Sequence, residues 1–199
     1  MSDTGSVPIE YPKSAPADRE TAGPLDASEA NAVRPYVDLG GLKILPRPEL
    51  GLRLEVEEST KRVVAVALDY SGSTLQVQPF AAPRTSGLWH EIRQQIADQI
   101  QKQGGSAREV QGPFGVELHA EVPAPTATEP SARRLARFVG VDGPRWFLRG
   151  VISGRGAVEP AAAAEIEDLF RSIVVVRGGS PMPPRDLIPL HVPATAQQA

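Results

Sequence analysis

The sequence predicts an α+β domain in which an antiparallel sheet carries two amphipathic helices. Three observations lead to this class. Most segments between residues 33 and 178 alternate apolar and polar residues, which is typical of strands with one exposed face. Only two segments show the period of a helix. Strands and helices do not alternate regularly, as they would in a doubly wound parallel fold.

The first half of this body predicts a meander of short strands. We expect strands at residues 36–39, 42–45, 51–57, 63–68 and 74–80. Gly40-Gly41 is a turn signal between the first two. The third alternates strictly and should have one wet face, whereas the fourth is more continuously apolar and should be buried. Turn residues at 69–73 precede the fifth.

Two helices are expected. From Leu88 an apolar residue recurs at every fourth position for three further steps. Ser86 is the expected N-cap of this helix, and Gly104-Gly105 is its expected end. The second helix is expected at residues 159–172, with Pro160 at its first position. Each helix should pack its apolar face on the sheet.

The second half of the body predicts further strands and a hairpin. The expected strands are residues 116–122, 134–141, 145–152 and 174–176. In the first of them Glu117, His119 and Glu121 share one side, which we interpret as the wet face of an edge strand. Asp142-Gly143 lies between the next two strands and is a strong signal for a two-residue hairpin. The last strand is apolar and should be buried.

Both ends of the chain differ from this body in composition. Residues 1–32 carry six acidic and two basic side chains, four prolines and few large apolar residues. Such a segment buries too little surface to offset the cost of ordering, so we expect a disordered acidic leader. Residues 179–199 are rich in proline but include several aliphatic residues, and we expect an extended tail on the body with a frayed end. A single domain is expected at residues 33–178.

The composition excludes several classes of protein. The 199 residues contain no cysteine, which excludes disulfides, thiolate metal sites and cysteine nucleophiles. The formal charge is −3, from 21 basic and 24 acidic side chains, so overall positive charge gives no reason to expect nucleic-acid binding. There is no secretory signal and no stretch of about 20 apolar residues, so we expect a cytoplasmic protein without a membrane span.

The sequence shows no catalytic motif. The sequence lacks a Walker loop, a Gly-x-Ser-x-Gly elbow and a His-Glu-x-x-His pair. His90, His119 and His191 lie on an expected helix, strand and tail, and they share no ligand spacing. We therefore expect no catalytic residue, no metal site and no cofactor.

The strongest local feature is a cluster of arginines in the predicted hairpin. Between residues 133 and 155 there are six arginines and one acidic residue. An arginine on a rigid sheet can bind a phosphate or carboxylate through two hydrogen bonds. The candidate anion- or partner-binding residues are Arg133, Arg137, Arg145 and Arg149. The alternative is that the arginines pair with acidic residues of neighbouring strands, such as Glu55, Glu57, Glu117 and Glu121.

Three segments resemble an uncharacterised actinobacterial family, catalogued as domain of unknown function 3710. They are residues 137–150 (RFVGVDGPRWFLRG), 36–42 (YVDLGGL) and 88–92 (LWHEI). The resemblance extends over residues 33–192 and implies no established activity, cofactor or catalytic residue. The order of elements is also similar to that of the PsbP/Mog1-like sandwich, whose members are mainly binding and assembly proteins. That similarity is an analogy at the level of fold.

The lack of a catalytic motif predicts a non-enzymatic module that binds or assembles with a protein partner. Two alternatives come from other functional classes. One is a binder of anionic ligands or nucleic acid through the arginine-rich hairpin. The other is an enzyme that acts on a small, nucleotide-related molecule with residues gathered from distant strands. The sequence does not identify the partner.

Overall fold

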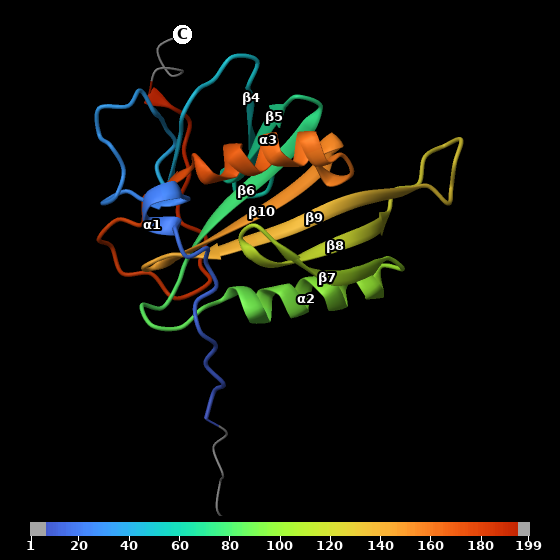
Figure 1. Ribbon diagram of the computed structural model, residues 1–199, viewed down its shortest axis with the longest axis horizontal. Coiled ribbons are helices and arrows are strands. Elements are labelled where there is room, and N and C mark those ends of the chain that lie inside the picture. Colours follow the sequence, from blue (N-terminus) through green and yellow to red (C-terminus); the bar gives the residue numbers. More distant parts are fainter. Residues whose placement is uncertain (1–6, 195–199) are drawn as a thin grey trace, which may run out of the picture.

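The computed structural model describes residues 7–194 and confirms the α+β class (Figure 1). Its main element is a seven-stranded sheet in the order β4-β5-β6-β10-β9-β8-β7, in which every neighbouring pair is antiparallel. The strands are β4 (Gly51–Glu57), β5 (Arg62–Tyr70), β6 (Ser73–Ala81), β7 (Ser106–Gly112), β8 (Gly115–Pro123), β9 (Arg133–Asp142) and β10 (Trp146–Gly154). The predicted hairpin at Asp142-Gly143 is present as β9 and β10.

Two helices pack on opposite faces of this sheet (Figure 1). Helix α2 (Trp89–Lys102) lies over the half formed by β7, β8 and β9. Helix α3 (Pro160–Arg171) covers the other face and follows a single 3-10 turn, η1 (Arg155–Ala157). The predicted second helix is therefore confirmed, including the proline at its first position.

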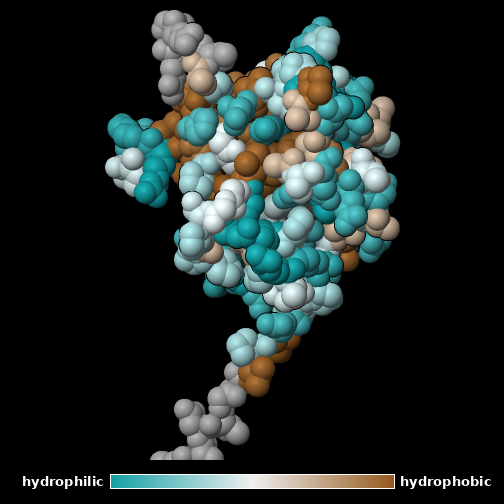
Figure 2. All heavy atoms as spheres, turned by 90° about the vertical axis from the view of Figure 1, so that its left-hand side faces the viewer, coloured by the Kyte–Doolittle hydropathy of each residue, from teal (hydrophilic) through white to brown (hydrophobic). Residues whose placement is uncertain are grey.

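A second, four-stranded sheet packs next to α3 on the same face of the large sheet. It has the order β1-β11-β3-β2, with β1 (Leu25–Asp26), β2 (Val37–Asp38), β3 (Leu42–Ile44) and β11 (Val174–Val175). β1 runs parallel to β11, and the other pairs are antiparallel. On this side of the molecule, which also carries α1 (Arg19–Ala22), mostly hydrophilic side chains cover the surface, and hydrophobic atoms show between them (Figure 2).

The two faces of the large sheet have separate cores. The larger core lies under α3 and the small sheet, where Leu75, Val139 and Phe170 have no exposed surface. The smaller core lies under α2, where the rings of Trp89 and Phe147 stack with centroids 5.7 Å apart. Burying one such side chain contributes about 1.5–3 kcal/mol, so packing rather than helix propensity holds both helices in place.

The start of α2 differs from the prediction that Ser86 caps the helix. The helix begins at Trp89, and no side chain of its own N-cap residue makes a capping bond. The amide of Leu88 instead donates to Oδ1 of Asp142, at 2.9 Å, from the β9–β10 turn. A carboxylate beside the first amides of a helix satisfies their hydrogen bonds and complements the helix dipole. The cap is supplied by a residue 54 positions away in the sequence.

From Tyr11 onward, the described part of the expected leader contacts the body, and Tyr11 forms a bridge with Gly87. β1 pairs with β11, and buried Arg19 makes two hydrogen bonds to Glu29, at 2.8 and 2.9 Å. The Arg19 guanidinium also lies over the ring of Trp146. The prediction weighed only apolar area, whereas backbone pairing and a buried ion pair attach this segment. Residues 1–6 of the predicted leader lie outside the described residues.

The C-terminal segment lies extended on the body up to the last described residue, 194. Leu187 forms a bridge with Phe80, and Leu190 forms bridges with Gly40 and Val63. Ile188 and Leu190 are buried, so the aliphatic residues of this proline-rich segment attach it to the domain. The predicted frayed end at residues 195–199 lies outside the described residues.

Asp142→Ala is expected to lower the free energy of unfolding by about 3 kcal/mol, because it removes a helix cap and leaves buried amides without an acceptor. Urea unfolding at pH 7, followed by circular dichroism, measures this loss. The matched control is Asp38→Ala, since exposed Asp38 accepts only the amide of Gly40 in its own turn. A loss at Asp142 no larger than that at Asp38 would contradict the role of Asp142.

The same carboxyl group predicts a pH dependence. Burial raises the pKa of Asp142 above its ordinary value of 3.8, and the amides of Leu88 and Ser14 only partly oppose this. A carboxyl whose pKa is raised on folding adds stability below its unfolded pKa, and this contribution is lost as pH rises through the folded pKa. The free energy of unfolding of the wild type, relative to that of Asp142→Asn, should therefore be lower at pH 7 than at pH 3. Urea titrations across this range test the sign.

Candidate functional site

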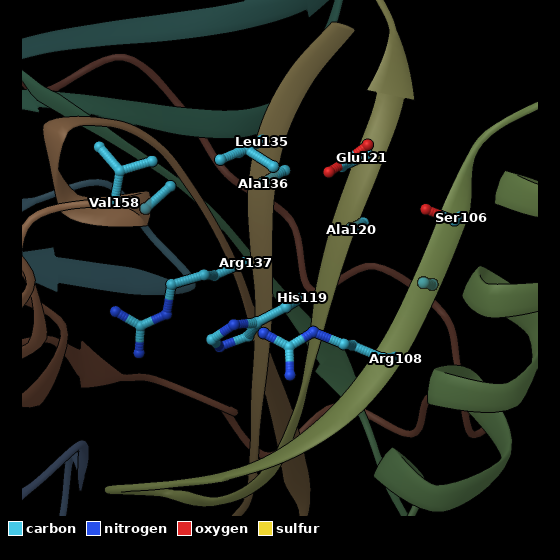
Figure 3. Close-up of a pocket in the computed structure, with 11 residues that line it drawn as sticks. Ser106, Arg108, His119, Ala120, Glu121, Leu135, Ala136, Arg137 and Val158 are labelled. Atoms are coloured by element: carbon cyan, nitrogen blue, oxygen red, sulfur yellow. The ribbon is translucent and has the colours of Figure 1, made fainter.

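A groove crosses β7, β8 and β9 on the face of the sheet that carries α3 (Figure 3). Its volume is about 540 Å³. A shallower hollow of about 300 Å³ continues it toward the start of α3 and shares four of its lining residues. The shared residues are His119, Arg137, Ala157 and Val158. The two hollows therefore form one elongated depression rather than a closed pocket.

The register of the three strands places the polar residues of the groove in rows. His119 lies opposite Arg108 of β7 and opposite Arg137 of β9. In the next row Glu121 lies opposite Ser106 and Leu135. Directly opposed residues share a face of the sheet, so Arg108, His119 and Arg137 project side by side (Figure 3).

Behind this row lies a buried ion-pair network. Nη2 of Arg137 donates to both carboxylate oxygens of Glu117, each at 3.0 Å, and to Glu167 of α3 at 2.7 Å. Its Nη1 donates to the carbonyl oxygen of Gly156 at 3.2 Å. Burial disfavours the charge of Arg137, but Glu167 and Glu117 outweigh this effect and raise its pKa. The network joins β8, β9 and α3, and both of its carboxylates line the smaller hollow.

His119 connects this network to the open groove. Its Nε2 lies 2.9 Å from Oε1 of Glu117, and its side chain is 30% exposed. A carboxylate only accepts hydrogen bonds, so Nε2 carries the proton and Nδ1 is left for other partners. The prediction that Glu117, His119 and Glu121 form the wet face of an edge strand is therefore wrong for Glu117, which is buried. β8 is also not an edge strand, because β7 lies outside it.

Apolar and charged side chains alternate around the groove. Leu135 and Val158 are 42% and 58% exposed, which is unusual for aliphatic residues in a sheet and at a helix start. Arg108 is exposed and forms no ion pair with any residue from 7 to 194, and neither does Glu121. Arg108 was not among the predicted site residues, because the strand that carries it was not predicted.

The structure does not bring the four candidate arginines together. Arg137 lines the groove, but its guanidinium pairs with Glu117 and Glu167. For this arginine the structure shows pairing with acidic residues, the alternative to an open anion site. Arg133 is exposed and donates to the carbonyl oxygen of Gly104 at 3.2 Å. Arg145 precedes β10, at the turn end of the hairpin.

Arg149, the fourth candidate, projects from the opposite face of the sheet. Its guanidinium carbon lies 6.0 Å from the ring centroid of Phe138, on the α2 side. Burial lowers the pKa of Arg149, and its Nε has no hydrogen-bond partner among the described residues. A shared anion site for all four arginines would need them on one face, which the register of β9 and β10 does not allow.

The fold and groove define an α+β protein with an open antiparallel sheet whose exposed depression lies beside an edge strand. Residues 23–199 match the model of a family described as "Protein of unknown function (DUF3710)". The chain belongs to this family. No curated protein and no solved structure matches it, so the similarity to the PsbP/Mog1-like sandwich stays a prediction.

Within residues 7–194, no group of three or more histidine, aspartate or glutamate side chains is arranged to hold a metal ion. No helix in this part is both long enough and apolar enough to cross a membrane.

Arg137→Ala is expected to lower the free energy of unfolding by about 3–5 kcal/mol, because it leaves the buried carboxylate of Glu117 without the guanidinium that pairs with it. Arg155→Ala is the matched control, since Arg155 forms an exposed pair with Glu159 one helical turn away. The control should lose about 0.5 kcal/mol or less. Urea midpoints and slopes give both values, and equal losses in the two variants would contradict the buried network.

Proposed function

We propose that this protein is a non-enzymatic binding module and that the groove over β7, β8 and β9 holds an extended segment of a partner protein. The observation that carries the proposal is the lining of the groove, where exposed Leu135 and Val158 flank unpaired Arg108 and Glu121. Exposed apolar residues beside polar groups without partners are typical of a surface that another chain covers.

The neighbouring edge of the sheet supports an extended partner. All seven residues of β7 pair with β8 on one side, and its other side has no strand among the described residues. β7 contains no proline, and its register has no bulge. The opposite edge strand, β4, is interrupted by a bulge between Glu55 and Val56. A regular, unprotected edge is the element to which a peptide adds as a further strand.

The charges of the groove indicate the chemistry of such a partner. Arg108 offers a guanidinium that forms no ion pair within residues 7–194, and Glu121 offers a carboxylate in the adjacent row. An extended segment with an aliphatic side chain between an acidic and a basic one would satisfy both charges and cover Leu135. Partly exposed pairs of this kind contribute mainly to orientation and specificity.

The two alternatives have weaker support. The separation of the arginines argues against one anion site in the hairpin. The contact between His119 and Glu117 is the observation that favours an enzyme, because a histidine oriented by a carboxylate can act as a general base. The cytoplasmic location stays a prediction, which fractionation of cells of the source organism would test.

Photo-crosslinking tests the proposal. p-Benzoylphenylalanine in place of Val158 should give one discrete adduct with another protein in cells of the source organism, and Arg108→Glu should reduce its yield several-fold. The matched control is the same group in place of Val56, which is similarly exposed on β4 at the opposite edge. No adduct at position 158, or the same adduct from both positions, would overturn the proposal.

A further inference from the structure

A second hollow lies near the opposite edge of the sheet, between the β4–β5 hairpin and the C-terminal segment. Its volume is about 540 Å³. One wall is formed by Lys61, Arg62 and Val63, and the other by residues between Leu187 and Val192. It shares no residue with the groove over β7, β8 and β9. It can therefore bind a ligand independently of the proposed partner segment.

The body of this hollow is aliphatic. Leu190 pairs with Val63 through an isolated bridge, which fixes the distance between the two walls. Leu187 and Val192 extend the apolar lining, and Val192 is 39% exposed at its end. Hydrophobic atoms are visible on this side of the molecule near the C-terminal end of the described chain (Figure 2). A volume between about 300 and 1,000 Å³ with mainly apolar walls is typical of a small-molecule site.

The charged residues of the hollow are all basic. Lys61 and Arg62 are exposed at its rim, and neither side chain forms an ion pair within residues 7–194. Glu57 lies directly opposite Arg62 in the β4–β5 register, but neither Glu57 nor Glu58 lines the hollow. Lys61 adopts a left-handed backbone conformation, with φ of 59°, which sets the course of the turn at this rim. The lining therefore combines aliphatic walls with a basic rim.

We propose that this hollow binds a small amphipathic anion, namely a free carboxylic acid with an aliphatic body. The aliphatic body would lie against Val63, Leu190 and Val192, and the carboxylate would meet Lys61 and Arg62. Each buried methylene favours binding through the area removed from water, while the cations select the charged head. A neutral alcohol of equal length lacks the second contribution, and a short carboxylate lacks the first.

Octanoate, 1-octanol and acetate separate these contributions. Calorimetry and amide chemical shifts of the full chain should show saturable binding of octanoate with shifts at residues 61–63 and 187–192. Acetate should not bind at the same concentration, and 1-octanol should bind about tenfold more weakly. Lys61→Glu with Arg62→Glu should weaken octanoate about tenfold and leave 1-octanol unchanged. Lys102→Glu, an exposed charge change on α2, is the matched control and should change neither.

Val192→Thr, a neutral polar change of similar size, tests the aliphatic wall and should weaken octanoate and 1-octanol alike. Three results would overturn the proposal. The first is no saturable octanoate binding at millimolar concentration. The second is equal binding of octanoate and 1-octanol that the charge reversals do not alter. The third is sedimentation of the protein with phosphatidylglycerol vesicles without saturable octanoate binding, which would identify a lipid surface rather than a free acid as the ligand.

Discussion

The carboxylate of Asp142 connects three parts of the chain that are far apart in sequence. Oδ1 accepts the amide of Leu88 at the start of α2, and Oδ2 accepts the amide of Ser14 in the leader at 3.0 Å. The amide of Asp142 donates in return to the carbonyl oxygen of Ser14 at 2.8 Å. α2 covers β7, β8 and β9 on the face opposite the groove, so this one buried side chain supports the strands that line the groove.

The elements predicted from sequence were those with a strong local period or turn signal. The apolar stripes of both helices and the Asp142-Gly143 turn are local features, and tertiary packing did not override them. β7 was missed because its apolar residues, Ala107 and Val110, are an odd number of positions apart and project to opposite faces. Composition did not reveal the contacts between the leader and the body, because they are polar contacts with partners remote in the chain.

Which side chains meet in the candidate site depends on how neighbouring strands are aligned, and the sequence did not predict that alignment. Arg137 lies opposite Ile152, and Arg149 lies opposite Gly140, so arginines that are close in sequence project to opposite faces of the hairpin. The row of Arg108, His119 and Arg137 instead comes from three strands paired in a particular alignment. The grouping of Glu117, His119 and Glu121 on one face was predicted correctly. The burial of Glu117 was not, because it requires Arg137 and Glu167 as partners.

The attachment of the leader determines where the folded unit begins. The family match starts at residue 23, yet Lys13, Ser14 and Arg19 all contact the body upstream of that point. Nζ of Lys13 donates to the carbonyl oxygens of Pro83 and Gly143, and Arg19 donates to that of Pro24. A polypeptide cut at the family boundary would lose these contacts and leave Glu29 without its cation. The conserved-domain boundary and the physical boundary of the fold are therefore different positions in this chain.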